Sequence, residues 1–283
     1  MSEIEAYKRA KTVQEACQLM KEPSTRVIAG GTDILLKARM FSVPVTLVDI
    51  SGIDGLSGVW TAQDGIRIGA ATRLADVVRS GPLQGEAYQA LLQGAVQVGS
   101  PQIRNLATLG GNLCNASPSA DTAAPLLALE AWAELESPAG IRRVPLAAFF
   151  RGPGKTVLAV GELLTAIIIP TQPAGARSVY LKHSPRRAMD LAFVGVAVWT
   201  AGQAVRIALG AVAPTPMRAT SAENYLNQAE VLDEAVLCEA ARLTAQAAKP
   251  ISDVRSTAAY RLEMVRALSL RALRQILAIQ AER

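Results

Sequence analysis

Two pairs of adjacent glycines, far apart in the chain, constrain its fold and its chemistry more than any other feature. The first pair lies in the segment AGGTD at residues 29–33, and the second lies in TLGGN at residues 108–112. Each pair follows or adjoins apolar, strand-like residues and opens into small polar residues that can begin a helix or a turn. Because glycine lets main-chain N–H groups turn toward a ligand, two such loops can grip a pyrophosphate from two sides. The sequence therefore predicts a site for a dinucleotide cofactor.

The composition is that of a folded protein and excludes several classes of function. Half of the 283 residues are hydrophobic, and this length suffices for two or three compact subdomains. No apolar run reaches roughly 18 residues and the N-terminus lacks a secretory apolar region, so we expect a cytoplasmic protein without membrane contact. The net charge of +5 is scattered and aromatic residues are few, so nucleic acid is not an expected partner. A phosphate-bearing ligand and an acidic partner subunit explain the charge equally well.

The cysteines and the single histidine are too dispersed to hold a metal ion. Cys17, Cys114 and Cys238 are widely separated, and His183 is the only histidine in the chain. We therefore expect no zinc or iron–sulfur site within this chain. Cys17 and Cys238 fall in helical patterns and are expected in the core. Cys114 follows the second glycine pair, which places it near a ligand but gives no support for catalysis by its thiol.

Apolar runs and breakers divide the chain into three segments, at residues 1–55, 56–174 and 175–283. The first segment predicts a small βαβ-like unit that carries the first glycine pair. Its expected elements are a helix at 12–21, a strand at 26–29, a helix from Thr32 or Asp33, and a strand at 45–50. The unit is too short for a Rossmann domain, and GGTD is not the GxGxxG of that fold.

The second segment predicts strands and helices around one long stretch, residues 99–121, that shows little periodicity and is typical of a functional loop. Its expected strands are 65–70, 163–169 and two that flank a turn at 138–140, and its expected helices are 72–78, 88–98 and 122–129. The third segment predicts three consecutive antiparallel strands with a tight hairpin, followed by amphipathic helices. These strands are 178–183, 191–200 and 205–212, and the helices are 221–248 and 254–281.

Five motifs in this order resemble the flavoprotein (medium) subunit of the bacterial molybdenum hydroxylases. This family includes xanthine dehydrogenase and carbon monoxide dehydrogenase, and the chain most resembles the FAD-binding subunit of the former. The motifs are AGGTD at 29–33, QIRNLATLGGNLCNASPSADTAAPLLAL at 102–129, GPGK at 152–155, ELLTAIIIP at 162–170 and LKHSPRRAMDLAFVGVA at 181–197. The resemblance implies an α+β fold, with a two-subdomain FAD-binding module of the PCMH type. A C-terminal domain of a three-stranded antiparallel sheet plus helices would follow it.

The resemblance also implies which residues hold FAD. The backbone of the first loop and the second glycine loop would cradle the diphosphate, and side chains of Thr32, Thr108 and Asn112 could add hydrogen bonds. Ile103 and Leu164 would line the flavin pocket, although Leu164 as an ordinary core residue is an open alternative. The implied cofactor-binding set from the two loops is Arg26, Val27, Ile28, Ala29, Gly30, Gly31, Thr32, Asp33, Ile34, Thr108, Gly110, Gly111 and Asn112.

Two charged residues complete the set that the resemblance implies. Asp121 would contact the sugar or ribityl region of the cofactor, or would cap the helix that begins at Thr122. Lys182 would lie near the isoalloxazine edge and stabilise the anionic reduced flavin, or would be a surface lysine on an exposed strand. Some relatives hold an extra iron–sulfur cluster in a cysteine-rich insertion, which this sequence lacks. FAD is therefore the only cofactor expected in this chain.

The function that the resemblance implies is electron transfer within a multi-subunit oxidoreductase. A molybdenum subunit would hydroxylate the substrate, and a [2Fe–2S] subunit would pass the electrons to FAD and then to NAD or another acceptor. No residue of this chain would be catalytic in the hydroxylation. One alternative is a stand-alone FAD-dependent reductase or oxidase of the same flavin-binding fold, such as the enolpyruvyl reductase of cell-wall synthesis. Another is a non-catalytic nucleotide-binding scaffold.

Overall fold

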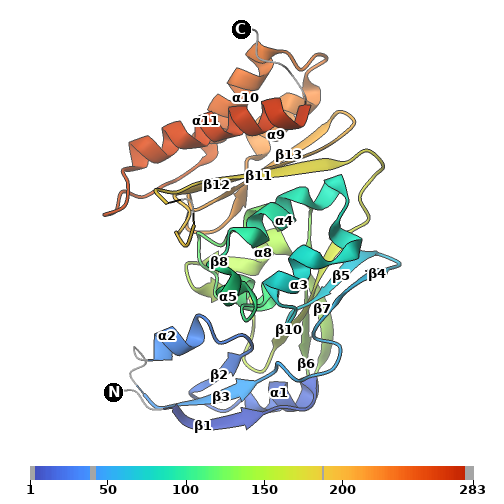
Figure 1. The fold of residues 1–283 in the computed structure, drawn as a ribbon, viewed down its shortest axis with the longest axis vertical. Coiled ribbons are helices and arrows are strands. Elements are labelled where there is room, and N and C mark those ends of the chain that lie inside the picture. The colour runs from blue at the N-terminus through green and yellow to red at the C-terminus, as the bar shows by residue number, and fades with distance from the viewer. Residues whose placement is uncertain (1–3, 39–42, 187, 278–283) are drawn as a thin grey trace.

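The computed structural model describes residues 4–38, 43–186 and 188–277. In Figure 1 its main sheets follow one another along the long axis, from the N-terminal part at one end to the C-terminal helices at the other. The fold is mixed α and β, as the sequence predicts. No helix among the described residues is long and apolar enough to cross a membrane.

The N-terminal part is a small parallel sheet in the strand order β1-β3-β2. Helix α1 packs its buried Ala16 and Cys17 under this sheet, beside Val48 of the central strand. The sequence analysis did not anticipate β1, whose residues IEAYKR are mostly exposed and half charged. The elements are β1 (Ile4–Arg9), α1 (Val13–Leu19), β2 (Thr25–Ile28), α2 (Ile34–Ala38) and β3 (Val45–Asp49).

The middle part is an antiparallel five-stranded sheet with helices packed on one face. Its central strand is the apolar run LLTAIIIP, which is buried along almost its whole length because it has a neighbour on each side. The strand order is β4 (Val59–Ala62), β5 (Gly65–Gly69), β10 (Leu163–Pro170), β6 (Trp132–Ser137) and β7 (Gly140–Pro145). The helical elements are α3 (Leu74–Arg79), η1 (Gly81–Leu83), η2 (Glu86–Tyr88), α4 (Gln89–Val96), α5 (Pro101–Arg104), α6 (Leu109–Cys114), α7 (Ala123–Ala128) and α8 (Leu146–Phe149), followed by the short strands β8 (Phe150–Gly152) and β9 (Lys155–Thr156).

The stretch 99–121 is more regular than its composition suggests, which corrects the expectation of one long irregular segment. It contains α5 and α6, and each begins at a hydroxyl side chain that caps the helix. The hydroxyl oxygen of Ser100 accepts from the amide of Ile103 at 3.3 Å, and that of Thr108 accepts from the amide of Gly111 at 3.0 Å. Local capping outweighs the low helix propensity of the two glycines, so the second glycine pair lies in the first turn of a helix.

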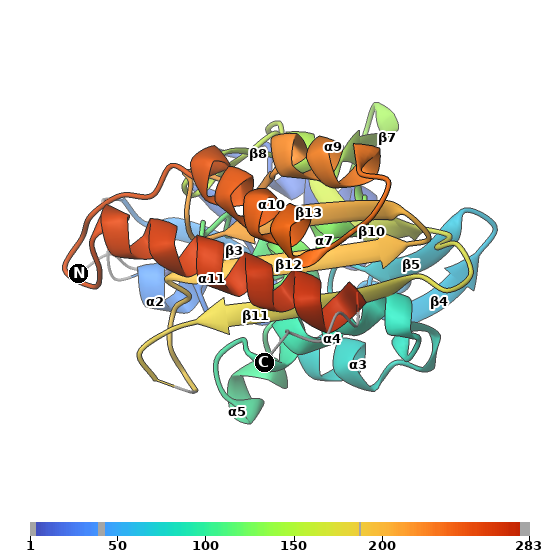
Figure 2. The ribbon, with the colours of Figure 1, turned by 90° about the horizontal axis from the view of Figure 1, so that it is seen from above.

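The C-terminal part is an antiparallel sheet covered by helices on its outer face. The three long strands β11 (Arg177–His183), β12 (Val194–Ala201) and β13 (Ala204–Gly210) match the predicted meander, and the two-residue strand β14 (Met217–Arg218) extends it to four. Figure 2 shows α11 lying across this sheet. Val265, Leu268, Leu273 and Ile276 of α11 are buried against it. The helices are α9 (Thr220–Gln228), α10 (Glu234–Ala247) and α11 (Ala258–Leu277).

Two C-terminal expectations need correction. The predicted helix at 221–248 is two helices, because Asp233 caps a new helix by accepting from the amide of Val236 at 2.9 Å. Cys238 is exposed on α10 rather than in the core. Residues 278–281 of the second predicted helix lie outside the described residues.

The C-terminal sheet packs closely on the middle part and so helps to form the site. Tyr180, Ala197 and Trp199 of this sheet belong to the same buried cluster as the helices of the middle part. The guanidinium of Arg206 stacks on the ring of Trp199 at 3.9 Å and pairs with Glu130 at 2.7 Å, at the end of α7. The joint between the two parts is therefore both apolar and charged, and it fixes where β11 presents its side chains.

Candidate functional site

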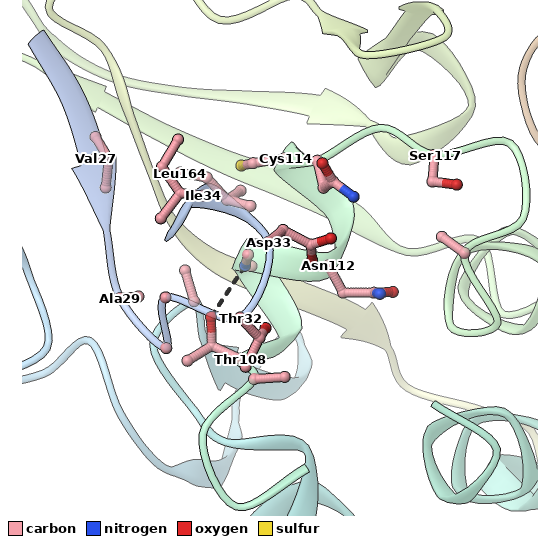
Figure 3. A pocket seen from close by; sticks show the side chains of 18 of the residues that line it. Val27, Ala29, Thr32, Asp33, Ile34, Thr108, Asn112, Cys114, Ser117 and Leu164 are labelled. Carbon is pink, nitrogen blue, oxygen red and sulfur yellow. Dashed lines mark hydrogen bonds between the residues drawn. The ribbon is translucent and has the colours of Figure 1, made fainter. Parts of the chain in front are cut away.

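A cavity of about 440 Å³ lies where the three parts of the chain meet. One wall is the loop between β2 and α2, and the opposite wall is α6 with the loop that follows it (Figure 3). Asp190 and Leu191, from the loop between β11 and β12, line a further part of it. Figure 3 shows Thr32 and Asp33 on the first wall and Thr108 and Asn112 projecting from the second. Both glycine pairs therefore border one cavity, although they are 80 residues apart in the sequence.

Most of the residues singled out from the sequence line this cavity, and three do not. Ile28 is buried beneath the first wall with Val45 and Leu47. The guanidinium of Arg26 donates to the carbonyl of Thr25 at 2.8 Å. Lys182 lies behind the wall. The lining residues from the set are Val27, Ala29, Gly30, Gly31, Thr32, Asp33, Ile34, Ile103, Thr108, Gly110, Gly111, Asn112, Asp121 and Leu164.

The two glycines of the first pair are needed for different reasons. A Cβ on Gly30 would lie 1.9 Å from the carbonyl oxygen of Leu106, so only glycine lets the loop approach the middle part. Gly31 has a φ of +74°, in the left-handed region that side chains disfavour. Together they turn the chain sharply after β2 and hold the loop against the segment before α6.

The first loop leaves its main-chain donors unused. No described residue accepts a hydrogen bond from the amides of Gly30, Gly31, Thr32 or Asp33, and all four residues line the cavity. Backbone amides are obligatory donors, so a run of them without a protein partner beside a cavity is a binding feature. The donor set suits anionic oxygens such as those of a diphosphate.

The second glycine pair does not offer its amides, which changes the expectation of two equivalent loops. The amide of Gly110 donates to the carbonyl of Ala70 at 2.8 Å. The amides of Gly111 and Asn112 donate to the hydroxyl and the carbonyl of Thr108, both at 3.0 Å. A Cβ on Gly110 would lie 2.6 Å from Ala70, so this glycine lets α6 pack closely on the residue that follows β5. The groups that α6 can still offer are side chains, the Thr108 hydroxyl and the Asn112 amide.

A buried ion pair forms the far end of the cavity. The ammonium of Lys182 lies 2.8 Å from Asp121 Oδ2, and their side chains are only 5% and 8% exposed. Lys182 also donates to the carbonyls of Asp190 at 2.8 Å and Gln97 at 3.4 Å, so its three donors are occupied. The hydroxyl of Tyr180 donates to Asp121 Oδ1 at 2.8 Å. Lys182 therefore ties together three separate segments at the cavity end.

This arrangement excludes one of the two alternatives that the sequence left open for each residue, the cap for Asp121 and the surface position for Lys182. Asp121 does not cap α7, because both its oxygens are bonded to β11; the N-cap residue of α7 is Thr122, which makes no side-chain capping bond. Burial raises the pKa of the Asp121 carboxyl above its usual value, although the charge and hydrogen bonds of Lys182 and the Tyr180 hydroxyl oppose the shift. Lys182 is neither a surface lysine nor a lining residue, since Asp121 stands between it and the cavity.

Sequence reasoning missed several residues of the cavity wall. Ser117 and Ser119 line it and lie within the quoted motif SPSAD, so their small polar side chains were a usable signal. Lys37 of α2 also lines it, and it lies four residues after Asp33, which immediately precedes the helix, so the two face the same side. The expected neighbour Cys114 does line the wall, but burial raises the pKa of its thiol to about 12, so it is no nucleophile at neutral pH.

The fold and the cavity define a class: a cofactor-binding protein with a loop of unpaired amide donors at one wall and a buried ion pair at the end. Comparison with known families is consistent with this class along nearly the whole chain. Residues 2–172 match the family described as FAD binding domain in molybdopterin dehydrogenase. Residues 179–276 match the CO dehydrogenase flavoprotein C-terminal domain.

Individual relatives cover the chain from end to end. A putative xanthine dehydrogenase FAD-binding subunit of Escherichia coli K12 is 34% identical over 98% of each chain. The carbon monoxide dehydrogenase medium chain of Hydrogenophaga pseudoflava is 33% identical over 94% of this chain and 95% of its own length. A solved structure of carbon monoxide dehydrogenase from the same organism superposes with a TM-score of 0.92 at 31% identity, covering 99% of this chain and 100% of that one. The chain belongs to the FAD-binding medium subunits of the molybdenum hydroxylase family, and its cofactor is FAD.

Proposed function

We propose that this chain is the electron-transfer subunit of a xanthine dehydrogenase-like molybdenum hydroxylase complex. Its partners are a [2Fe–2S] small subunit, which delivers electrons, and a large subunit with the molybdenum cofactor, which hydroxylates the substrate. The electrons leave to NAD or another acceptor. The names of the relatives, as medium chains and FAD-binding subunits, support a place in such a complex.

We propose that the unpaired amides of residues 30–33 hold the FAD diphosphate, with the Thr108 hydroxyl and the Asn112 side chain on the opposite wall. The whole sequence-derived set extends this site to Asp121 and Leu164 at the cavity and to Lys182 behind it. When bound, FAD supplies one- and two-electron redox chemistry. The residues around it bind and orient it, and the three segments 1–55, 56–174 and 175–283 serve as the domains that do so.

The observation that carries the electron-transfer role is that most acidic groups of the cavity are already engaged. Asp121 is paired with Lys182, and Glu162 is paired with Arg142 at 2.6 Å and also accepts from the amide of Ala159. A reductase that protonates its own substrate needs a titratable donor free to face that substrate. These buried carboxylates are held in ion pairs and are not free to donate a proton to a substrate, which fits a subunit whose only task is electron transfer.

A purified complex and the isolated chain together test this proposal. We expect the isolated chain to be yellow with bound FAD, and its flavin to be reduced by a hydroxylatable substrate only when the partner subunits are present. Anaerobic flavin bleaching at visible wavelengths provides the measurement. A colourless chain that takes up no FAD would reject the proposal, as would an isolated chain whose flavin is reduced by the hydroxylatable substrate. The three free thiols favour a reducing compartment, and we place the complex in the cytoplasm.

A further inference from the structure

We propose that Lys37 is the cation that binds the FAD diphosphate, and that it leaves Asn115 to do so when the cofactor enters. This inference rests on the proposed FAD site. It assigns a role to a residue outside the set that the sequence indicated. It follows from the charges of the cavity wall and from the place of Lys37 on α2.

The charge balance of the cavity singles out Lys37. Among the described residues that line the cavity, Lys37 alone has a basic side chain. A diphosphate carries about two negative charges near neutral pH, and amides alone do not neutralise them. Of the four lining carboxylates, Asp33 has no base within ion-pair distance among the described residues, so it adds a negative charge. The other three already pair with bases that do not line the cavity, so these bases bring no free positive charge to it. These pairs are Asp121 with Lys182 at 2.8 Å, Glu162 with Arg142 at 2.6 Å and Asp190 with Arg186 at 3.3 Å.

The position of Lys37 brings its ammonium to the place where the two walls meet. Lys37 follows Asp33 by one helical turn, and its amide donates to the Asp33 carbonyl at 3.1 Å. Asn115 follows Gly111 in the same way on the opposite wall, with its amide 3.0 Å from the Gly111 carbonyl. The ammonium of Lys37 donates to Asn115 Oδ1 and so spans the cavity from α2 to the end of α6. One helical turn rises about 5.4 Å, a distance that the long lysine stem covers by changing rotamers.

The oxygen that Lys37 bonds in this structure is a weaker hydrogen-bond acceptor than a phosphate oxygen would be. Asn115 Oδ1 is the oxygen of a neutral amide, and no described carboxylate pairs with Lys37. Hydrogen bonds from an ammonium to an anionic oxygen are shorter and stronger than those to a neutral one. The unpaired amides of the first loop lie one turn away, so Lys37 and these amides would meet the same diphosphate. The lysine then gives up its contact with Asn115 and binds the diphosphate together with these amides.

The test compares ligands that differ in the diphosphate. Lys37→Gln, Lys37→Arg and a control, Lys249→Gln on the exposed C-terminal side, are prepared as full-length deflavinated chains. FAD affinity is measured by flavin fluorescence, and ADP and adenosine are used as competitors. We expect Lys37→Gln to lower the affinity for FAD and for ADP by about tenfold and to leave the affinity for adenosine unchanged. Tenfold is about the low end of what a charged hydrogen bond contributes at an exposed site. Lys37→Arg should keep most of the affinity, and Lys249→Gln all of it.

Salt gives a second readout, because screening weakens only the charged contact. The difference between the wild-type chain and Lys37→Gln should shrink as ionic strength rises to about 1 M. Equal affinities of the two proteins for FAD would overturn the role of Lys37 while leaving the FAD site intact. An equal loss of affinity for ADP and for adenosine would also overturn this role, since Lys37 would then affect only the shape of the cavity. Failure of the wild-type chain to bind FAD would instead refute the proposed function.

Discussion

Replacing Lys182 by methionine tests whether the buried pair at the cavity end is held by charge. Methionine matches the length of the lysine stem but removes its ammonium, which bonds Asp121 and two carbonyls. The carboxylate of Asp121 would keep only the Tyr180 hydroxyl at 2.8 Å as a partner. Because the Asp121 side chain is 8% exposed and meets solvent only at the cavity, water replaces the lost ammonium incompletely.

The expected loss is large for a single substitution. Removing one partner of a buried ion pair costs about 3–5 kcal/mol, since the other charge remains buried and uncompensated. A chain of this size loses roughly 2–4 °C of Tm for each kcal/mol, so Tm should fall by about 10 °C. The double variant Lys182→Met/Asp121→Asn should recover much of this loss, because the asparagine oxygen can still accept from Tyr180 and no buried charge is left.

The pH dependence follows from the same pair. Burial already raises the pKa of Asp121 above the usual value of 3.8, so the folded state holds that proton better than the unfolded state does. Stability then falls as pH rises from the unfolded to the folded pKa. Without Lys182 the pKa of Asp121 rises further and this interval extends upward. The stability deficit of Lys182→Met should therefore be greatest at neutral pH and shrink as pH is lowered toward about 4.

Thermal melts by circular dichroism, recorded for the wild type, both single variants and the double variant between about pH 5 and pH 8, measure these effects. The reasoning is refuted if Lys182→Met loses less than about 1 kcal/mol, because the lysine would then be replaceable by solvent. It is also refuted if the two single losses simply add in the double variant. A deficit that does not change with pH would remove Asp121 as its source.

Three further predictions concern the glycine pairs and the thiols. Gly30→Ala should abolish FAD retention, because its Cβ would meet a backbone carbonyl at 1.9 Å. The control Gly81→Ala, whose Cβ would have no atom within 4 Å, should retain FAD fully, as the flavin absorbance of the purified proteins would show. In hydrogen exchange read by mass spectrometry, the amides of residues 30–33 should exchange fast without FAD and slowly with it; those of residues 110–112 should be slow in both, and the reverse order would contradict the assignment of donors. Alkylation at neutral pH should modify exposed Cys238 first and leave Cys114 intact until the protein unfolds, as peptide mapping would show.

The sequence predicts most of the middle and C-terminal strands because their apolar runs are long. The run at β10 and the middle strand of the meander, β12, are buried almost throughout, and such apolar runs are visible in the local sequence. The sequence does not predict β1, because its residues are mostly exposed and include three charges, Glu5, Lys8 and Arg9. Its pairing with β3 is decided by contacts some 40 residues away, as in Lys8 opposite Val48.

Sequence motifs identify most of the residues that line the cavity, but they do not reveal the contacts between them. The glycine loops and Asp121 stand in recognisable segments, and the structure places them around one cavity. The burial of Lys182 depends on Asp121, which is 61 residues distant, and no local pattern encodes that contact. The same holds for Lys37, whose partner Asn115 is 78 residues away. Ion pairs across a cavity are properties of the tertiary structure, and residue types alone leave them undetermined.

The two glycine pairs look alike in sequence yet cannot exchange roles, and hydrogen bonding explains why. Thr108 precedes its pair and caps it, so the amides that follow become the first turn of a helix with internal acceptors. Ala29 precedes the other pair and has no side chain that could accept from those amides. The positive φ of Gly31 then directs the chain away from β2 and leaves the amides of residues 30–33 without acceptors. The second pair therefore packs its helix against the sheet, and only the first pair keeps amide donors without a partner among the described residues, as the proposed diphosphate site requires.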